Sequence, residues 1–280
     1  MTKNLPDNTQ DIQVIQITDL HLLVHGHDRL KGITTWQTFE AVMEKITHED
    51  PKPDLVLVTG DLVHDGPVAV YRRLRTRMDL IDAPVYVLPG NHDDPALLAG
   101  TFGIDAKTDK MDAADPIDFG YATPGNWLIV FLNSVVPGEV YGVLAPEEID
   151  RLDRLLGDHA GCHALLCLHH HPVSRRFGDP DFLAVLRNAE VFFSIIDRHP
   201  NVRGIVWGHI HDAFEGQRKE VRLLGTPSTC FQFDSTLKRV SPDDGPPAYR
   251  RLTLKPDGVI ESEVVEVPIQ PGSPGSSLPD

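Results

Sequence analysis

Residues 85–93 read VYVLPGNHD: an apolar run stops at a Pro-Gly pair, and Asn91, His92 and Asp93 follow in succession. Proline and glycine mark the end of strand pairing, and Asn and Asp avoid strand interiors. The stretch therefore predicts a buried strand whose carboxyl end carries side chains suited to chemistry rather than to packing.

Four other apolar runs also end in polar side chains of the kind that ligate metals. The five runs, in chain order, cover residues 12–17, 55–58, 85–88, 164–168 and 202–207. The polar residues that follow them are Asp19 and His21, Asp61, Asn91 and His92, His170, and His209 and His211. Functional groups of open α/β sheets gather at the carboxyl ends of the strands, so these residues are expected to converge on one edge.

Helical patterns lie between several of these runs. Apolar residues recur at helical spacing in 35–46 and 68–81, and residues 146–156 begin with a proline and two glutamates, as many helices do. Strands that alternate with helices predict βαβ units and a sheet with parallel strands, so the expected fold class is α/β. Residues 95–124 show no comparable regularity.

Length and composition indicate one large domain or at most two. The chain has 280 residues, of which 41% are hydrophobic, and we expect a single domain over 12–268 with disordered tails at 1–11 and 269–280. The formal net charge of -15 argues against nucleic acid or an anionic membrane as a partner bound through a broad basic face. The expected partner is a small molecule.

Cysteine usage and hydropathy favour a cytoplasmic location. Three cysteines without a CxxC pair are typical of reduced thiols. The N-terminal residues lack the apolar segment of a secretory signal, and no apolar run approaches the ~18 residues that span a membrane.

The residue types after the five runs favour transition metals. Carboxylates, imidazoles and one amide suit Mn, Fe, Zn or Ni better than an all-oxygen calcium or magnesium site. Each piece alone has an ordinary structural explanation: residues 19–21 as a capped turn, or the three histidines 169–171 as a hydrogen-bonded corner. Five such endings at the same structural point make coincidence a poor explanation.

Five spaced motifs also carry a family resemblance. They are Asp19-x-His21, Gly60-Asp61, Gly90-Asn91-His92-Asp93, His170-x-Pro172 and Gly208-His209-x-His211. This series resembles the calcineurin-like metallophosphoesterase superfamily. Within it the chain is most similar to the bacterial class III 3′,5′-cyclic AMP phosphodiesterases, through QITDLHL at 16–22, GITTW at 32–36, RNAE at 187–190 and TPSTCFQF at 226–233. The resemblance implies a four-layer α/β/β/α sandwich with a dinuclear metal centre.

The resemblance also assigns ligands. One ion would be held by Asp19, His21, Asp61 and His211, and the second by Asp61, Asn91, His170 and His209, with Asp61 as the bridge. The family pattern places a ligand two residues before the proline, which selects His170. His169 and His171 are then expected to support the site without binding metal. Iron and manganese are the expected ions, with zinc, cobalt or nickel as alternatives.

A mechanism follows from the same resemblance. A hydroxide that bridges two ions about 3.5–4 Å apart would attack phosphorus in line. His92 would stabilise the transition state or protonate the leaving oxygen, and substrate contacts are expected from His21, Asn91, His92 and His211. Asp93 is expected to orient His92, with a cap for the following turn as the alternative.

The expected reaction is hydrolysis of 3′,5′-cyclic AMP to 5′-AMP. Two alternatives stay open: a phosphodiesterase for glycerophosphodiesters or other small phosphodiesters, and a non-catalytic scaffold of the same fold. Arg175, Arg176 and Arg187 are candidates to meet the substrate, residues 226–230 could line its base, and the 235–247 loop could shape access. The resemblance also suggests a homodimer.

Overall fold

The computed structural model describes residues 9–104, 119–174, 185–233, 242–243 and 245–269. Most of the two expected tails, Arg175, Arg176 and most of the 235–247 loop lie outside these residues. No helix within the described ranges is long and apolar enough to cross a membrane.

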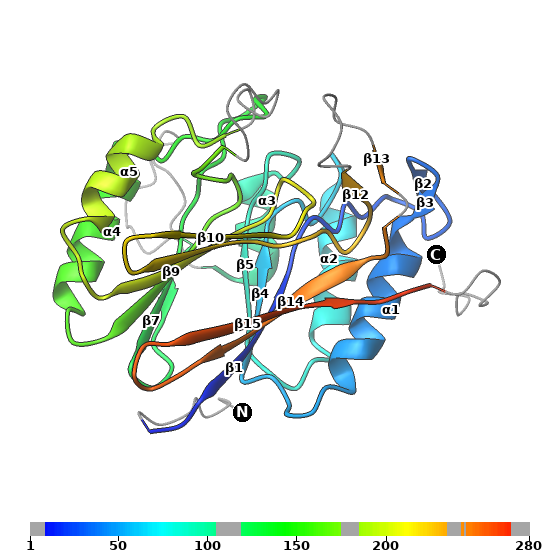
Figure 1. The fold of residues 1–280 in the computed structure, drawn as a ribbon. Helices are drawn as coiled ribbons and strands as arrows, with labels where there is room; N and C mark the ends of the chain where they lie inside the picture. Colours follow the sequence, from blue (N-terminus) through cyan, green and yellow to red (C-terminus); the bar gives the residue numbers. More distant parts are fainter. Residues whose placement is uncertain (1–8, 105–118, 175–184, 234–241, 244, 270–280) are drawn as a thin grey trace.

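A five-stranded sheet is built around the first strand of the chain (Figure 1). Its order is β15 (Ile260–Glu266), β14 (Ala248–Leu254), β1 (Ile12–Ile17), β4 (Leu55–Thr59) and β5 (Val85–Leu88). The last three strands are parallel, and β14 pairs antiparallel with both β1 and β15. The carboxyl ends of three of the predicted apolar runs therefore meet at one edge of this sheet.

A six-stranded sheet contains the other two predicted runs. Its order is β10 (Phe214–Arg218), β11 (Val221–Gly225), β9 (Val202–Trp207), β8 (His163–Cys167), β7 (Trp127–Phe131) and β6 (Tyr121–Ala122). The four central strands are parallel, and the two edge strands are antiparallel to them. Two short pairs complete the described strands: β2 (Arg29–Leu30) with β3 (Ile33–Thr34), and β12 (Gln232–Phe233) with β13 (Pro242–Asp243).

The helices lie on the outer faces of the two sheets, as Figure 1 shows. One hydrophobic core joins the first sheet to the helices α1 (Thr35–Thr47), α2 (Val68–Met78) and α3 (Pro95–Phe102). A second core joins the second sheet to α4 (Pro146–Asp158) and α5 (Ala189–Ile196).

Strand β7 shows how the two sheets face each other. Trp127, Ile129 and Phe131 belong to the core that contains the first sheet, whereas Leu128 and Val130 pack with α4 and α5. Successive side chains of a strand point to opposite faces, so a strand buried on both faces is apolar throughout. The predicted α/β/β/α sandwich is confirmed.

Helix α3 lies in the segment without apparent regularity. Asp94 caps it by accepting hydrogen bonds from the backbone of Ala96 and Leu97, Pro95 occupies the first turn, and Gly103 ends it at φ 66°. An acidic cap, an early proline and a terminal glycine are recognised signals of a helix. The helix itself, PALLAGTF, lacks the polar face that helical periodicity usually reveals. The helix expected at 68–81 ends at Met78.

Candidate metal centre and active site

The loops after the parallel strands bring the predicted residues together between the two sheets. The loops after β1 and β4 run side by side, because Asp19 N–H donates to Gly60 O and His21 N–H donates to Asp61 O, both at 2.9 Å. The loop after β9 joins them, since His209 N–H donates to the carboxylate of Asp19 at 2.9 Å. Two of these hydrogen bonds join backbone to backbone and the third joins backbone to the carboxylate of Asp19, and together they hold the three loops next to one another.

The same loops hold several side chains in an unfavourable backbone conformation. Five of the site residues have φ between 45° and 69°: Asp19, His21, Asp61, His209 and His211. A residue other than glycine whose backbone lies in the left-handed region lowers the stability of the fold by on the order of 1 kcal/mol or more. Such residues cluster at functional sites. Their concentration here marks the place where the fold gives up stability to present chemical groups.

Two motif glycines are required by the close approach of the loops. A Cβ atom on Gly60 would lie 2.3 Å from Nδ1 of His169, and one on Gly90 would lie 2.1 Å from Oδ1 of Asp61. Both contacts are far shorter than a carbon atom tolerates. The glycines of the Gly-Asp and Gly-Asn-His-Asp motifs therefore serve the packing of the site itself.

One set of ligand atoms gathers around His21 and His211. The Nε2 atoms of these two rings are 3.1 Å apart. His211 Nε2 is 3.3 Å from Oδ1 of Asp19, and His21 Nε2 is 3.6 Å from Oδ2 of Asp61. All four side chains are almost completely buried.

A second set gathers around His169. Its Nε2 atom lies 3.4 Å from Oδ2 of Asp61, 3.3 Å from Oδ1 of Asn91 and 3.1 Å from Nδ1 of His209. Asp61 therefore faces both sets through the same oxygen atom, as a bridging carboxylate would.

The spacing to the proline predicts His170 as a ligand, and one of its ring nitrogens lies within 4.8 Å of those of His169 and His209, but His169 is nearer to the other ligand atoms of the second set. Nδ1 of His170 is 2.8 Å from the hydroxyl of Ser134, and its Nε2 is buried without a hydrogen-bond partner among the described residues. Strand alternation explains the difference. Cys167 faces the first sheet and Leu168 faces the helices, so the next side chain, His169, again faces the first sheet.

Burial and charge set the protonation of the site. Burial alone would raise the pKa of Asp61, but the neighbouring His169 and His21 hold it well below its ordinary value. Burial would lower the pKa of His169, but Asp61 raises it to about 9. Burial lowers the pKa of His21 to about 3 and that of His209 well below its ordinary value. Apart from His169, these imidazoles are therefore neutral at pH 7 and have a lone pair available.

The arrangement fits two metal ions. His211 Nδ1 donates to the carbonyl of Phe231 at 2.7 Å, which leaves its Nε2 lone pair directed toward the carboxylate of Asp19 and the ring of His21. The two Nε2 atoms are 3.1 Å apart, so a cation that lies between them could be bound by the lone pairs of both rings. Imidazole, carboxylate and amide donors in two sets that share one carboxylate are typical of a dinuclear centre.

His92 stands beside the centre. Its backbone N–H donates to Oδ1 of Asp61 at 2.9 Å, and its ring Nδ1 lies 3.2 Å from Oδ2 of Asp65. The side chain keeps 31% of its surface exposed, in contrast to the buried side chains of Asp61 and His169. His92 can therefore meet a molecule that enters from solvent.

Asp93 has a different environment from the one expected for a partner of His92. Its carboxylate accepts hydrogen bonds from the backbone of Leu62, Val63 and Gly90 at 2.9–3.0 Å, and from the hydroxyl of Tyr71 at 3.0 Å. Burial and the charge of Asp61 raise its pKa to about 6. Asp93 thus ties the β4 and β5 loops together, and the contact with the His92 ring comes from Asp65.

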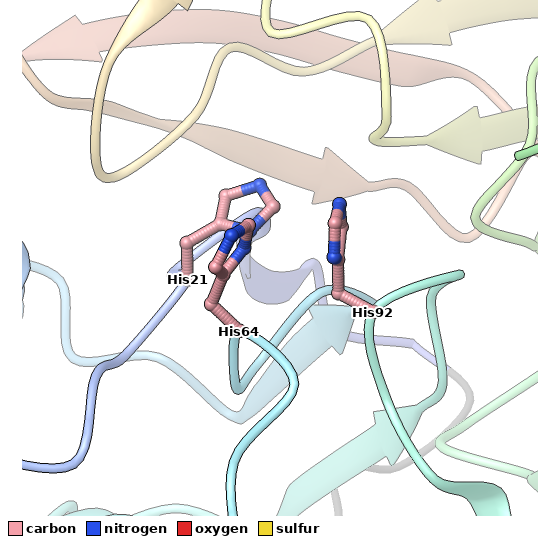
Figure 2. A group of neighbouring side chains, drawn as sticks. All are labelled: His21, His64 and His92. Atoms are coloured by element: carbon pink, nitrogen blue, oxygen red, sulfur yellow. The ribbon is translucent and has the colours of Figure 1, made fainter. Parts of the chain in front are cut away.

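His64 is a site residue that the sequence interpretation missed. Figure 2 shows its ring beside those of His21 and His92, on the loops that follow β4, β1 and β5. Nδ1 of His64 is 3.1 Å from Nδ1 of His21, and its ring stacks on that of His92 with centroids 4.3 Å apart. The sequence feature that could have indicated His64 is its position three residues after Asp61, within the same loop.

The other substrate candidates have structural partners. The guanidinium of Arg187 lies over the ring of Tyr141, 3.2 Å from its centroid. Ser228 donates through its hydroxyl to the carbonyl of Asp19 at 2.8 Å, and Thr229 N–H donates to the carbonyl of Thr18 at 3.1 Å. The 226–230 segment therefore holds the loop after β1 in place through the backbone carbonyls of Thr18 and Asp19.

Comparison with known proteins agrees with this geometry. The calcineurin-like phosphoesterase family matches residues 12–213. A 3′,5′-cyclic-nucleotide phosphodiesterase of Nostoc sp. is 35% identical over 96% of this chain and 95% of its own. The 3′,5′-cyclic adenosine monophosphate phosphodiesterase CpdA is 34% identical in Pseudomonas aeruginosa, over 94% and 93% of the two chains, and 34% identical in Escherichia coli K12, over 90% and 89%.

Solved structures show the same fold at low sequence identity. A dimetal phosphatase from Danio rerio superposes with a TM-score of 0.64 at 13% identity, over 92% of this chain and 99% of that one. A purple acid phosphatase from yellow lupin gives a TM-score of 0.60 at 13% identity, over 94% of this chain and 55% of that one.

Proposed function

Because this chain belongs to the calcineurin-like phosphoesterase family, we propose that it is a dinuclear-metal phosphodiesterase that hydrolyses 3′,5′-cyclic AMP to 5′-AMP. The observation that carries the proposal is the pair of ligand sets that share Oδ2 of Asp61, with His92 beside them. Relatives named for cyclic-nucleotide hydrolysis align over nearly the whole chain, which supports the choice of substrate.

The proposed ligand sets differ from the sequence-based assignment at one position. We assign Asp19, His21, Asp61 and His211 to the first ion, and Asp61, Asn91, His169 and His209 to the second. His169 replaces His170 because its Nε2 lies within 3.4 Å of ligand atoms from three other residues, whereas His170 is engaged with Ser134. We favour manganese or iron, since nitrogen and oxygen donors are mixed in both sets.

When bound, the two ions would supply Lewis acidity and lower the pKa of a water molecule that serves as nucleophile. The remaining work falls to the protein. Hydrolysis of a 3′,5′-cyclic phosphodiester breaks the bond between phosphorus and O3′, and O3′ must gain a proton as it leaves. His92 is placed to donate it from Nε2, because Asp65 engages the opposite nitrogen, Nδ1.

The backbone contact of His92 contributes separately. Its N–H donates to Oδ1 of Asp61, which leaves Oδ2 of that carboxylate for both ligand sets. One residue thus orients the shared ligand through its main chain and meets the leaving group through its side chain. The acidic character of the chain is compatible with an anionic substrate, because two divalent ions outweigh the two ligand carboxylates, Asp19 and Asp61.

A purified full-length protein, stripped of metal and reloaded with Mn²⁺ or Fe²⁺, tests the proposal. Initial rates would be compared for cyclic AMP, cyclic GMP, 2′,3′-cyclic AMP and a glycerophosphodiester. We expect metal-dependent turnover with cyclic AMP as the best substrate and 5′-AMP as the product. Faster turnover of the glycerophosphodiester would support the alternative phosphodiesterase, and no turnover of any diester by the loaded protein would support a scaffold.

Two further expectations accompany this function. The homodimer that the family resemblance suggests can be checked by light scattering on the purified protein. The cytoplasmic location can be checked by fractionation of the source cells. Neither property enters the proposed chemistry.

A further inference from the structure

His64 makes close contacts with two residues of the proposed centre but belongs to neither ligand set. Its Nδ1 is 3.1 Å from Nδ1 of His21, and the two rings meet edge to face at 70°. Its opposite side stacks on His92 at an interplanar angle of 30° (Figure 2). The ring of His64 is therefore confined between a proposed ligand and the proposed proton donor.

The backbone places His64 opposite His21. Leu22 N–H donates to Leu62 O, and His64 N–H donates to Leu22 O, both at 3.1 Å. A parallel bridge between Leu22 and Val63 continues this ladder. Because these bonds involve main-chain atoms alone, a change of the side chain at 64 leaves the two loops in register.

The positions of protons around His21 require a particular partner. To ligate a metal through Nε2, the neutral ring of His21 must carry its proton on Nδ1. That N–H points at Nδ1 of His64, so the latter atom must accept, and the proton of His64 must sit on its Nε2. The reverse assignment puts a proton on Nε2 of His21, where it would be donated to Nε2 of His211 or to the carboxylate of Asp61 and would leave no lone pair for a metal ion.

We infer that His64 is a positioning residue that holds His21 in its metal-binding tautomer by accepting the hydrogen bond from Nδ1. Metal-bound histidines generally donate their second N–H to such a partner, which fixes the ring and makes the ligand more basic. Here the partner is another histidine instead of a carboxylate. This inference rests on the metal assignment proposed above and is independent of the substrate.

A pair of substitutions separates the acceptor from the ring. His64→Phe keeps an aromatic ring that can stack on His92 but removes the acceptor, whereas His64→Asn keeps an acceptor near the Nδ1 position and removes the ring. His27→Phe, at a side chain that is 80% exposed, is the matched control. Mn²⁺ affinity of each metal-free, full-length variant would be measured from the electron paramagnetic resonance signal of free Mn²⁺.

We expect His64→Phe to weaken one of two Mn²⁺ sites about tenfold or more, and His64→Asn to stay within about threefold of the unaltered protein. In the unaltered protein loaded with diamagnetic Zn²⁺, ¹H–¹⁵N correlation spectra of the imidazoles should show the proton of His21 on Nδ1. Equal Mn²⁺ binding by His64→Phe and the control, or equal losses in Phe and Asn, would overturn the inference. So would a His21 proton on Nε2, or a third Mn²⁺ per chain that His64→Phe abolishes.

Neither measurement involves substrate. A protein that fails to hydrolyse cyclic AMP but loses Mn²⁺ in His64→Phe would contradict the proposed function and still support the role of His64.

Discussion

Alanine substitutions at His169 and His170 should affect different properties: the first should weaken metal binding, and the second should lower the stability of the fold. His169 Nε2 faces Asp61, Asn91 and His209 at 3.1–3.4 Å, which is the geometry of a ligand. His170 has its Nδ1 atom 2.8 Å from the hydroxyl of Ser134, although one of its ring nitrogens lies within 4.8 Å of those of His169 and His209. The two residues are neighbours in sequence and both are completely buried, so each variant controls for the other.

The magnitudes follow from these contacts. Four-ligand sites bind zinc with a free energy of roughly 10–16 kcal/mol, or about 3 kcal/mol per ligand. His169→Ala should therefore lower the affinity for one of the two ions on the order of 100-fold. His170→Ala removes the buried partner of Ser134, which costs about 1–3 kcal/mol of unfolding free energy. For a chain of this size, that loss lowers Tm by roughly 2–4 °C per kcal/mol.

The assay combines Mn²⁺ titration of the metal-free proteins with thermal unfolding in the presence of a chelator. We expect His169→Ala to lose one tight Mn²⁺ and His170→Ala to keep both while its Tm falls. Ser134→Ala should reproduce part of the Tm loss of His170→Ala and leave Mn²⁺ binding unchanged. Loss of one Mn²⁺ in His170→Ala with normal binding in His169→Ala would refute the argument from strand alternation and restore the assignment based on spacing to the proline.

Three further results are expected. Asp61→Asn should lower the affinity for both ions, because Oδ2 of Asp61 faces both ligand sets. A Mn²⁺ titration in which one site keeps its affinity would contradict a shared ligand. His92→Asn should keep both Mn²⁺ ions but lower kcat on the order of 100-fold or more in steady-state assays, and unchanged turnover would remove it from the chemistry. Mn²⁺ binding at pH 7.5 should release roughly one proton from His169, whose pKa is raised to about 9 in the metal-free protein. Below pH 9 the metal ion has to displace a proton from His169, so the Mn²⁺ affinity should rise as the pH approaches 9 and then level off. Calorimetry in buffers of different ionisation enthalpy measures the number of protons released. A Mn²⁺ affinity that stays constant from about pH 7 to 9 would argue against this role of His169.

The amino-acid sequence determined the architecture and the types of residue in the site. Continuous apolar runs such as 55–58 require strands buried on both faces, and polar side chains directly after them must lie at the carboxyl ends of those strands. Parallel pairing then brings Asp19, Asp61 and Asn91 to one edge whatever the details of the loops. The α/β class and the convergence of these side chains follow from local pattern, whereas the four-layer sandwich and the dinuclear centre were implied by the family resemblance.

Only the tertiary structure decided which side chain of each cluster does what. Three consecutive histidines look alike in sequence, and the choice of His169 depends on which face of β8 points toward the first sheet. The contact between Asp65 and the His92 ring, and that between His64 and His21, join loops that follow different strands. Such pairs depend on the register between β1, β4 and β5, and register is a property of packed backbones rather than of any one segment.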